Sequence, residues 1–377
     1  MTKKRICIDC RHMHGKTQGI DRYVLEVLNH LEIIPSEFSI ALLHNSDFPF
    51  EYLSYPKRFS FICTKVRGCS LLQQFLVPYM LFVHRIDTYY YPYIDPPILS
   101  PARHNVFMIH DMNHFFFSQH AATEKVLAII ASKVFIFLAA IRYEKIITIS
   151  HYVAGQIAEH VAPSRGKIQV HYHGFSSGRF AAPSTGLVSS RPDAARMKLL
   201  YVGNNRPHKN IDGLLKAFKI ILTRIPSIQL VIAGNLAERF SNINGVVDQL
   251  GIGQAVSMFV SPSDAVLAGL YAESSIFVYP SFSEGFGLPL LEAMHFGLPI
   301  ACSNTSCLPE IAADAAHYFD PDNPQDMANK LLELLQDVRL RSELVRRGEI
   351  RLKCFTWENT ARSLRSALLD NHDGTTK

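Results

Sequence analysis

The 377-residue sequence is poor in charge and in cysteine. Charged residues make up 19% and apolar residues 48%, a balance that excludes an intrinsically disordered chain. Seven cysteines are scattered without zinc-type spacing. The single C-x-x-C, Cys7 and Cys10, lies inside "RICIDC", which reads as a strand, whereas a redox pair belongs at the start of a helix. We therefore expect these two cysteines to be packing residues and the thiols to stay reduced.

Long hydrophobic runs are also missing. Residues 70–84 and 126–141 are the longest apolar stretches, and polar residues interrupt both before they reach the length of a membrane span. We interpret them as core helices, with interfacial membrane helices as the alternative. The N-terminal "MTKKRICIDC" has no apolar core or cleavage site of a signal peptide. The sequence thus predicts a cytoplasmic protein, with peripheral attachment to the inner face of the cytoplasmic membrane as a further expectation.

The charge that is present is unevenly distributed. Residues 1–190 hold 19 Lys and Arg against 13 Asp and Glu, a balance of +6, and the remainder holds 19 against 20, a balance of −1. A basic N-terminal half suits an anionic membrane surface or an anionic acceptor, and ordinary surface asymmetry is the alternative.

Short apolar runs alternate with helical patterns along the whole chain, which is typical of doubly wound parallel sheets. The length favours two such domains, and the aperiodic stretch 181–197, rich in Pro, Gly and Ser, reads as a linker. We predict an N-terminal domain over residues 1–180 and a C-terminal domain over 198–355. A last helix over 356–377 is expected to cross back to the N-terminal domain.

In open α/β sheets, ligands bind beyond the carboxyl ends of the strands. Two loops of the C-terminal half follow strands there. "GNNRPHKN" carries Arg206 and Lys209 to a helix start, where cations and amides suit a phosphate or diphosphate, although a solvated loop is an equal alternative. "SFSEGFGLPLLE" places Glu284 before a glycine-rich turn and Glu292 eight positions later, where we expect the first turn of a helix. Carboxylates bind sugar hydroxyls and helix amides bind phosphate, so a nucleotide sugar fits.

At these residues the chain resembles retaining glycosyltransferases of family 4, which have the GT-B fold. "EGFGLPLLE" is similar to the Glu-x7-Glu signature of that family, and the other matching motifs follow in family order. They are "GIDRY" (19–23), "IHD" (109–111), "ITISHY" (147–152), "YVGNNRPHKN" (201–210), "LPEIAADAAHYFDP" (308–321) and "FTWENTA" (355–361). The pattern is most like bacterial mannosyltransferase-type members of surface polysaccharide synthesis, including O-antigen and lipopolysaccharide.

The resemblance implies a fold and a set of roles. The fold would be two Rossmann-like doubly wound domains that face a central cleft, of which the N-terminal domain would bind the acceptor and the C-terminal domain the nucleotide sugar. Glu284 and His110 would be the catalytic residues beside the transferred sugar. Glu292 would bind the ribose, and Lys209 and Arg206 the diphosphate. The remaining donor contacts would come from Gly19 and from the backbone amides of Gly285, Phe286, Gly287 and Leu288. Many family members carry Arg directly after the position of Gly203, where this chain has Asn204, so we expect Arg206 to take that role.

The activity that the resemblance implies is transfer of a hexose, mannose first, from a GDP- or UDP-linked donor to a glycan or polyprenyl-linked glycan. No D-x-D motif occurs in the cleft loops, so we expect no metal or other cofactor, and no nucleic acid is expected as a partner. Two alternatives stay open at this point. One is a nucleotide-sugar epimerase or phosphorylase of the same fold, and the other is a catalytically inactive sugar-nucleotide-binding partner.

Overall fold

A computed structural model describes residues 3–13, 19–66, 68, 70–112, 123–180, 197–237 and 242–369. Contacts divide the chain into two compact units, each of which is described by itself. Unit 1 consists of Met1–Gly174 with Thr356–Lys377, and unit 2 of Phe175–Phe355. The cleft expected between them stays a prediction, and the expected linker at 181–197 lies outside the described residues except for Met197.

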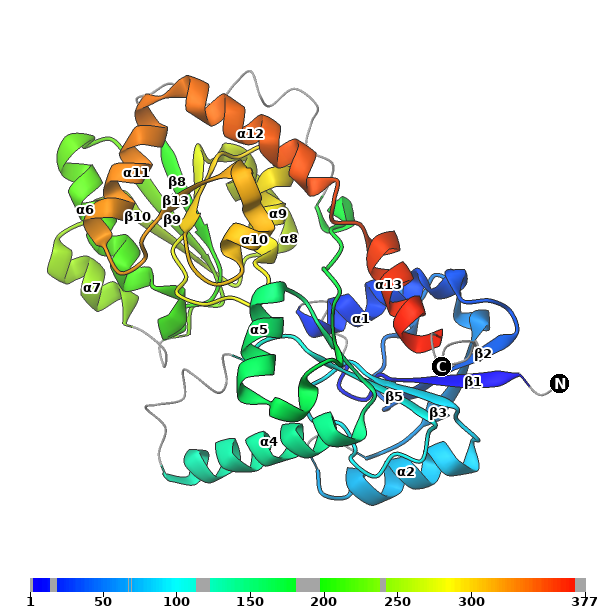
Figure 1. The fold of residues 1–377 in the computed structure, drawn as a ribbon. Helices are drawn as coiled ribbons and strands as arrows, with labels where there is room; N and C mark the ends of the chain where they lie inside the picture. The colour runs from blue at the N-terminus through cyan, green and yellow to red at the C-terminus, as the bar shows by residue number, and fades with distance from the viewer. Residues whose placement is uncertain are drawn as a thin grey trace. The chain divides into compact units, whose positions relative to one another are not determined.

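Unit 1 is built on a seven-stranded parallel sheet with the order β3-β2-β1-β4-β5-β6-β7 (Figure 1). The strands are β1 (Lys4–Asp9), β2 (Phe38–His44), β3 (Phe59–Cys63), β4 (Thr88–Tyr91), β5 (His104–Ile109), β6 (Lys145–Thr148) and β7 (Ile168–Val170). Ile6 of β1 lies opposite Ile40 on one side and Thr88 on the other, so the strand order reverses direction at β1. This is the strand order of a dinucleotide-binding fold.

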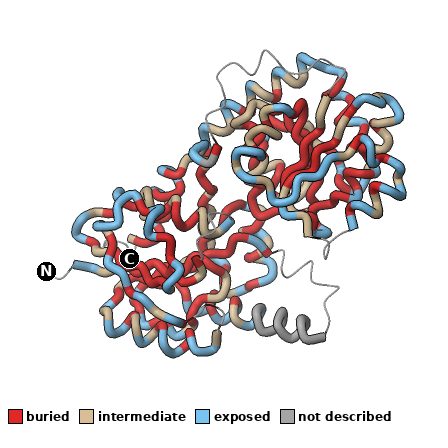
Figure 2. Tube along the Cα trace, turned by 180° about the vertical axis from the view of Figure 1, so that it is seen from behind, coloured by how far each residue is buried: buried red, intermediate tan, exposed pale blue. Residues whose placement is uncertain are grey.

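Helices cover both faces of that sheet. They are α1 (Ile20–Asn29), α2 (Gln73–Val83), α4 (Thr123–Arg142), α5 (His151–His160) and α13 (Trp357–Leu369). Helices α2, α4 and α5 share one apolar cluster with alternate residues of the strands, such as Tyr91 and Phe107, so they lie on the same face. Figure 1 shows α1 and α13 on the opposite face. Buried residues follow the strands, as the tube in Figure 2 shows.

Two local predictions for unit 1 can be followed in the structure. The Ser150 hydroxyl accepts a hydrogen bond of 3.2 Å from the Val153 N–H and caps α5, as expected for a serine before a helix. Trp357 begins α13 and is buried, and its ring lies 6.2 Å from that of Tyr23 in α1. The last helix therefore packs within unit 1.

Unit 2 repeats the architecture with a six-stranded parallel sheet, order β10-β9-β8-β11-β12-β13. Its strands are β8 (Lys198–Val202), β9 (Gln229–Gly234), β10 (Val256–Val260), β11 (Ile276–Tyr279), β12 (Ile300–Ser303) and β13 (Ala316–Phe319). Its helices are α6 (Ile211–Arg224), α7 (Ile243–Leu250), α8 (Asp264–Glu273), α9 (Leu288–His295), α10 (Leu308–Ala312), α11 (Pro324–Gln336) and α12 (Val338–Leu352). The order reverses direction at β8, which pairs with both β9 and β11.

The boundary between the units lies earlier than the predicted end of the N-terminal domain at residue 180. The Phe175 N–H donates to the Phe355 carbonyl oxygen at 3.0 Å, inside unit 2. The Phe180 ring packs on Tyr271 and Phe296 of the same unit, with centroid distances of 6.1 and 5.1 Å. These tertiary contacts assign residues 175–180 to unit 2, and local sequence carries no signal of them.

The interpretation of residues 70–84 and 126–141 as core helices is wrong in part. Both stretches form helices, but α2 and the described half of α4 each turn large apolar side chains to solvent. Phe75 and Phe82 of α2 are 68% and 72% exposed. None of the described helices is both long enough and apolar enough to span a membrane.

Unit 1 should lose stability in mild acid because it buries neutral histidines. Burial lowers the pKa of His110 and of His171 from 6.5 to about 4, and burial with the neighbouring His110 lowers that of His173. The unfolded chain binds these protons first, so stability present above pH 6.5 falls as the pH drops toward 4, by about 3 kcal/mol for each of His110 and His171.

Urea unfolding followed across this pH range measures that loss. The variant His171→Phe, which removes one titrating ring, is expected to show a shallower pH dependence than wild type. Replacement of the exposed His160 by glutamine is the matched control and should leave the slope unchanged. An unfolding free energy that stays constant from pH 6.5 to 4 would contradict the prediction.

Candidate functional site

Two loops of unit 2 meet at the carboxyl edge of its sheet, where the strand order reverses. Residues 203–210 follow β8 and residues 280–287 follow β11, and the two strands are neighbours. The Phe282 N–H donates to the His208 carbonyl oxygen at 2.8 Å and ties the loops together. Such a switch point is the usual ligand site of a doubly wound sheet.

A buried ion pair joins these two loops. The Lys209 Nζ lies 2.6 Å from Glu284 Oε1, and the two side chains are 10% and 9% exposed. The ammonium also donates to the Tyr279 hydroxyl at 3.4 Å, at the end of β11. The structure thus brings together the two charged residues that the sequence predicted for the diphosphate and for the sugar.

Glu284 is held in its charged form. Burial alone would raise the pKa of this carboxyl group, but the Lys209 charge and hydrogen bond, with further hydrogen bonds from Ser281 and Tyr279, lower it below 4.5. A buried carboxylate paired in this way is a candidate for function, since burial without a partner would neutralise it.

The loop after β12 supports Glu284 from the other side, and the sequence analysis did not assign it a role. The Glu284 N–H donates to the Ser306 hydroxyl at 3.3 Å, and the Cys307 thiol donates to the Glu284 carbonyl oxygen at 3.2 Å. Cys307 is fully buried. The sequence did contain a signal for this loop. It follows β12, which pairs with β11 in parallel, so the loops after the two strands lie at the same edge of the sheet.

Asn210 sets the position of Lys209. Lys209 ends a 3-10 turn (Pro207–Lys209), and Asn210 follows in a left-handed conformation with φ 54°. The Asn210 side chain accepts a hydrogen bond from the Gly213 N–H, which caps α6, and donates to the carbonyl oxygens of Pro280 and Pro321. A single side chain therefore anchors the Lys209 loop to the start of the Glu284 loop.

The glycine-rich turn leads into α9. Gly287 has φ 91°, a left-handed conformation that favours glycine, and it precedes the first helical residue, Leu288. The Phe286 ring is buried edge-to-face against Phe355 at 5.7 Å, so only the Phe286 backbone remains for a ligand. The helix ends at His295, and Gly297, with φ 60°, donates its N–H to the Met294 carbonyl oxygen in a Schellman arrangement.

Glu292 does not lie in the first turn of α9, where the sequence analysis placed it. The helix begins at Leu288, so four residues precede Glu292 and the first turn holds no acid. The helix dipole, which acts within the first turn, therefore does not explain this carboxylate. Glu292 is buried and accepts a hydrogen bond of 2.8 Å from the Tyr271 hydroxyl of α8, a partner that the sequence did not indicate.

Arg206 and Asn204 occupy the outer part of the first loop. Arg206 is exposed and directly precedes the 3-10 turn that ends at Lys209. The Asn204 side chain accepts a hydrogen bond of 3.1 Å from the Arg206 N–H, so the residue that replaces the usual arginine shapes the turn that carries Arg206.

The two remaining predicted residues, His110 and Gly19, lie in unit 1. His110 follows β5, and its Nε2 donates to the Pro92 carbonyl oxygen at 2.9 Å, which leaves Nδ1 as the acceptor of a neutral ring. Gly19 precedes α1 with φ 61° and ψ −127°, a conformation open to glycine, and among the described residues no atom beyond its chain neighbours lies within 4 Å of the Cβ it lacks.

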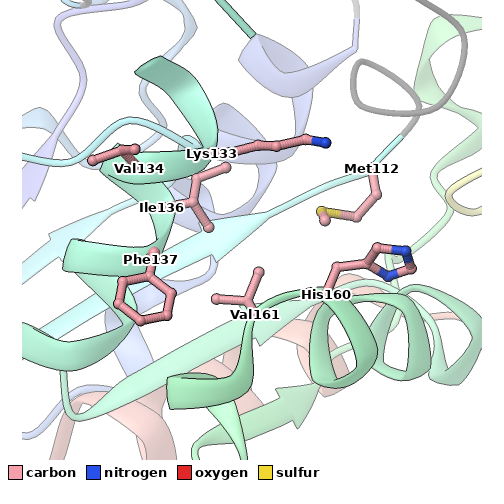
Figure 3. A pocket seen from close by; sticks show the side chains of 7 residues that line it. All are labelled: Met112, Lys133, Val134, Ile136, Phe137, His160 and Val161. Carbon is pink, nitrogen blue, oxygen red and sulfur yellow. The ribbon is translucent and has the colours of Figure 1, made fainter. Parts of the chain in front are cut away.

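Unit 1 also contains an apolar pocket of about 440 Å³ between α4 and the end of α5 (Figure 3). Val134, Ile136 and Phe137 of α4 face Val161, with Lys133 and His160 at its margin. Among the residues that the structure describes, no three or more His, Cys, Asp or Glu gather as they would around a metal ion.

The fold is that of GT-B proteins. A sucrose-phosphate synthase from Thermosynechococcus elongatus superposes with a TM-score of 0.76 at 17% identity, over 99% of this chain and 100% of that one. WaaG, a glycosyltransferase involved in lipopolysaccharide biosynthesis, gives a TM-score of 0.71 at 15% identity, over 98% and 100%. Identities this low show the fold alone.

Residues 189–351 match the family Glycosyl transferases group 1, so the chain contains a domain of that family. O-antigen chain mannosyltransferase B of Escherichia coli is 39% identical over 172 residues, 42% of this chain and 42% of that protein. D-inositol 3-phosphate glycosyltransferase of Paenarthrobacter aurescens (strain TC1) is 29% identical over 218 residues, 56% and 52%. The chain thus spans about half the length of these curated relatives.

Proposed function

We propose that this chain is a retaining hexosyltransferase that moves a sugar from a nucleoside-diphosphate donor to a glycan or lipid-linked glycan acceptor. The buried Lys209–Glu284 pair at the switch point of unit 2 is the observation that carries the proposal. The pair stands beside the start of α9 and within a group 1 glycosyltransferase domain.

The pair suits a donor that is both anionic and rich in hydroxyl groups. An ammonium carries three N–H donors, and Glu284 and Tyr279 account for two of them, which leaves capacity for a phosphate oxygen. The first N–H groups of α9 attract the same diphosphate. We assign the sugar hydroxyls and phosphate to the backbone of Gly285–Leu288, and the ribose to Glu292.

Glycosyl transfer passes through a positively charged, oxocarbenium-like state while the leaving diphosphate gains negative charge. Glu284, charged in the resting protein, would stabilise the sugar, and Lys209 with Arg206 would stabilise the leaving group. His110 would accept a sugar hydroxyl through Nδ1, and Gly19 would let the first loop approach the phosphates. The cations and helix amides supply positive charge at the diphosphate, so we propose that transfer persists in EDTA.

Mannose from GDP-mannose is the first candidate donor and UDP-sugars are the next. The O-antigen chain mannosyltransferase that matches this chain at 39% identity supports a mannosyl donor and a surface-polysaccharide acceptor. A polyprenyl-linked acceptor would place the reaction at the inner face of the cytoplasmic membrane, with the protein attached peripherally.

Thermal-shift measurements with GDP-mannose, UDP-sugars and free nucleoside diphosphates test the donor. A ligand at 100 times its Kd adds about 3 kcal/mol of stability, so the true donor should raise Tm clearly.

We expect Glu292→Gln to raise the donor KM about tenfold with little change in kcat, because it weakens a contact made equally in ground and transition states. Exposed Glu273→Gln in unit 2 is the control.

Acceptor dependence separates the alternatives. Donor turnover that occurs only with a glycan acceptor supports transfer, whereas turnover of donor to an isomer without acceptor indicates an epimerase. Stabilisation by nucleotide sugars without any turnover indicates an inactive binding partner. If none of the nucleotides shifts Tm, the proposed donor site is wrong.

A further inference from the structure

Helix α2 packs on the sheet through Val77 and Leu81, but its two glutamines point inward and a row of aromatic side chains points outward. Gln73 and Gln74 are buried, whereas Phe75, Tyr79 and Phe82 are exposed. These three aromatic residues recur at helical spacing and form one stripe. A helix on the surface of a water-soluble domain normally shows the reverse arrangement.

Internal hydrogen bonds hold α2 in this orientation. Gln73 accepts from the buried Arg11 guanidinium at 3.2 Å and donates to the Asp95 carbonyl oxygen at 3.2 Å. Gln74 accepts from the Ile98 N–H at 2.8 Å. Rotation that buried the aromatic stripe would break these contacts and leave Arg11 and its partners unsatisfied, which is costly for buried polar groups.

Helix α4 presents a second apolar stripe on the same side of unit 1. Its members lie at positions i, i+3, i+4 and i+7, and all four are exposed: Val134, Phe137, Leu138 and Ile141. Residues 98–100 connect the two helices, because Ile98 bonds Gln74 of α2 and Ser100 accepts from Arg142 of α4. Leu99, between those two contacts, is 59% exposed.

We call this surface the apolar face. It consists of Leu72, Phe75, Leu76, Tyr79, Phe82, Val83, Leu99, Val134, Phe137, Leu138 and Ile141. Single exposed apolar residues are ordinary, but a contiguous set of this kind marks an interaction surface. The apolar pocket of Figure 3 opens on the α4 side of the face, since Val134 and Phe137 belong to both.

The charges around the apolar face are positive. Residues 52–86, which contain α2, include no Asp or Glu but five Lys and Arg. Arg85 lies two residues after the end of α2, Lys133 and Arg142 lie on α4, and all three are exposed. The first acids after the ends of α2 and α4, Asp87 and Glu144, accept backbone N–H groups at 2.9 and 2.6 Å.

We propose that the apolar face docks unit 1 onto an anionic lipid bilayer. Aromatic and aliphatic side chains would enter the headgroup region while the surrounding cations bind lipid phosphates. A second copy of the chain fits less well, because a two-fold contact would set one rim of positive charge against another. The docking deepens the proposed function, because a lipid-linked acceptor lies in a bilayer. Vesicle binding can still be tested by itself, because its measurement needs no sugar donor.

Co-sedimentation of the full chain with vesicles tests the proposal. Wild type is expected to bind phosphatidylglycerol–phosphatidylcholine vesicles and to dissociate from them at high salt. It should not bind vesicles of pure phosphatidylcholine. The double variant Phe75→Ser/Phe82→Ser should bind at least about tenfold more weakly, since it removes apolar side chains that would enter the bilayer. Val338→Ser/Ile350→Ser in α12 of unit 2 changes equally exposed apolar residues and should bind as wild type does.

A second variant keeps the test independent of folding. Arg85→Asn/Lys133→Gln removes two rim charges, and asparagine tolerates the left-handed conformation of Arg85, with φ 52°. It should lose affinity for anionic vesicles while its Tm is unchanged. Equal binding by wild type and both variants, or no vesicle binding by wild type, overturns the proposal. A wild-type dimer that Phe75→Ser/Phe82→Ser converts to monomer overturns it in favour of a second copy.

The same preparations separate this proposal from the proposed function. The nucleotide-sugar donor should raise the Tm of wild type and of every variant made for the vesicle test by the same amount. The reason is that the apolar face belongs to unit 1 and the Lys209–Glu284 site to unit 2. Donor binding without vesicle binding means that the docking surface alone is wrong. Vesicle binding without donor binding means that the proposed function alone is wrong.

Discussion

Replacing Glu284 by glutamine is expected to lower kcat/KM for sugar transfer by about 10²- to 10³-fold while nucleotide binding survives. Glutamine keeps the shape of the side chain but removes the negative charge that would face the oxocarbenium-like sugar. Lys209 and the start of α9 stay in place for the diphosphate. Steady-state kinetics give the loss of transfer, and calorimetric titration with the nucleoside diphosphate gives the binding that remains.

A surface glutamate provides the matched control for this experiment. Glu333 forms an ion pair with His317 at the same distance, 2.6 Å, but its side chain is 48% exposed. Glu333→Gln should leave transfer unchanged. Because Glu284→Gln leaves Lys209 buried without an anionic partner, thermal unfolding of Glu284→Gln is measured beside its activity and shows whether the lost activity reflects a disturbed fold. Wild-type turnover in Glu284→Gln would overturn the role of this residue.

Replacing Gly234 by alanine is expected to destabilise unit 2 by about 3 kcal/mol or more. Gly234 ends β9 with φ 139°, a conformation that side chains rarely adopt. An added Cβ would lie 1.9 Å from the carbonyl oxygen of Gly203, a backbone atom that cannot turn aside. Gly203 begins the loop that carries Lys209, so the clash also displaces the site. Thermal unfolding should show a decrease in Tm of about 10 °C.

Gly269 in α8 offers the opposite case. No atom lies within 4 Å of the Cβ that this glycine lacks, and it occupies a helix interior. Gly269→Ala should therefore stabilise unit 2 by about 0.5–1 kcal/mol. If Gly234→Ala and Gly269→Ala change Tm by the same amount, the prediction for Gly234 is wrong. The close approach of the Gly203 carbonyl oxygen to Gly234 would then not decide whether unit 2 accepts a side chain there.

Much of the fold was predictable because it depends on local patterns. The buried central strands, such as β1 and β8, are continuous apolar runs, and the helices from α11 to α13 have clear helical spacing. The strands that the sequence analysis did not identify are β3 and β13, which lie at the edges of the two sheets. Both strands mix buried with exposed or half-buried residues in an irregular order, so they show neither a continuous apolar run nor a strict alternation.

The site was predictable in its charged residues but not in its supports. Lys209 and Glu284 stand in loops after recognisable strands, and their roles come from the resemblance to a glycosyltransferase family. Tyr271 could not be found in that way, because it lies in helix α8 and not in a loop after a strand. Helix α2 shows the same limit, since hydrophobicity alone predicted burial for side chains that the structure exposes.

The sequence by itself determined the two doubly wound domains, the loops that would carry the site, and the presence of cations and carboxylates in those loops. These depend on periodicity and on residue type, which are local properties. Only the tertiary structure decided that Lys209 touches Glu284, that Glu292 lies beyond the first turn of α9, and which side of α2 faces outward. Each of these depends on packing between distant segments, which hydrophobic pattern and propensity do not encode.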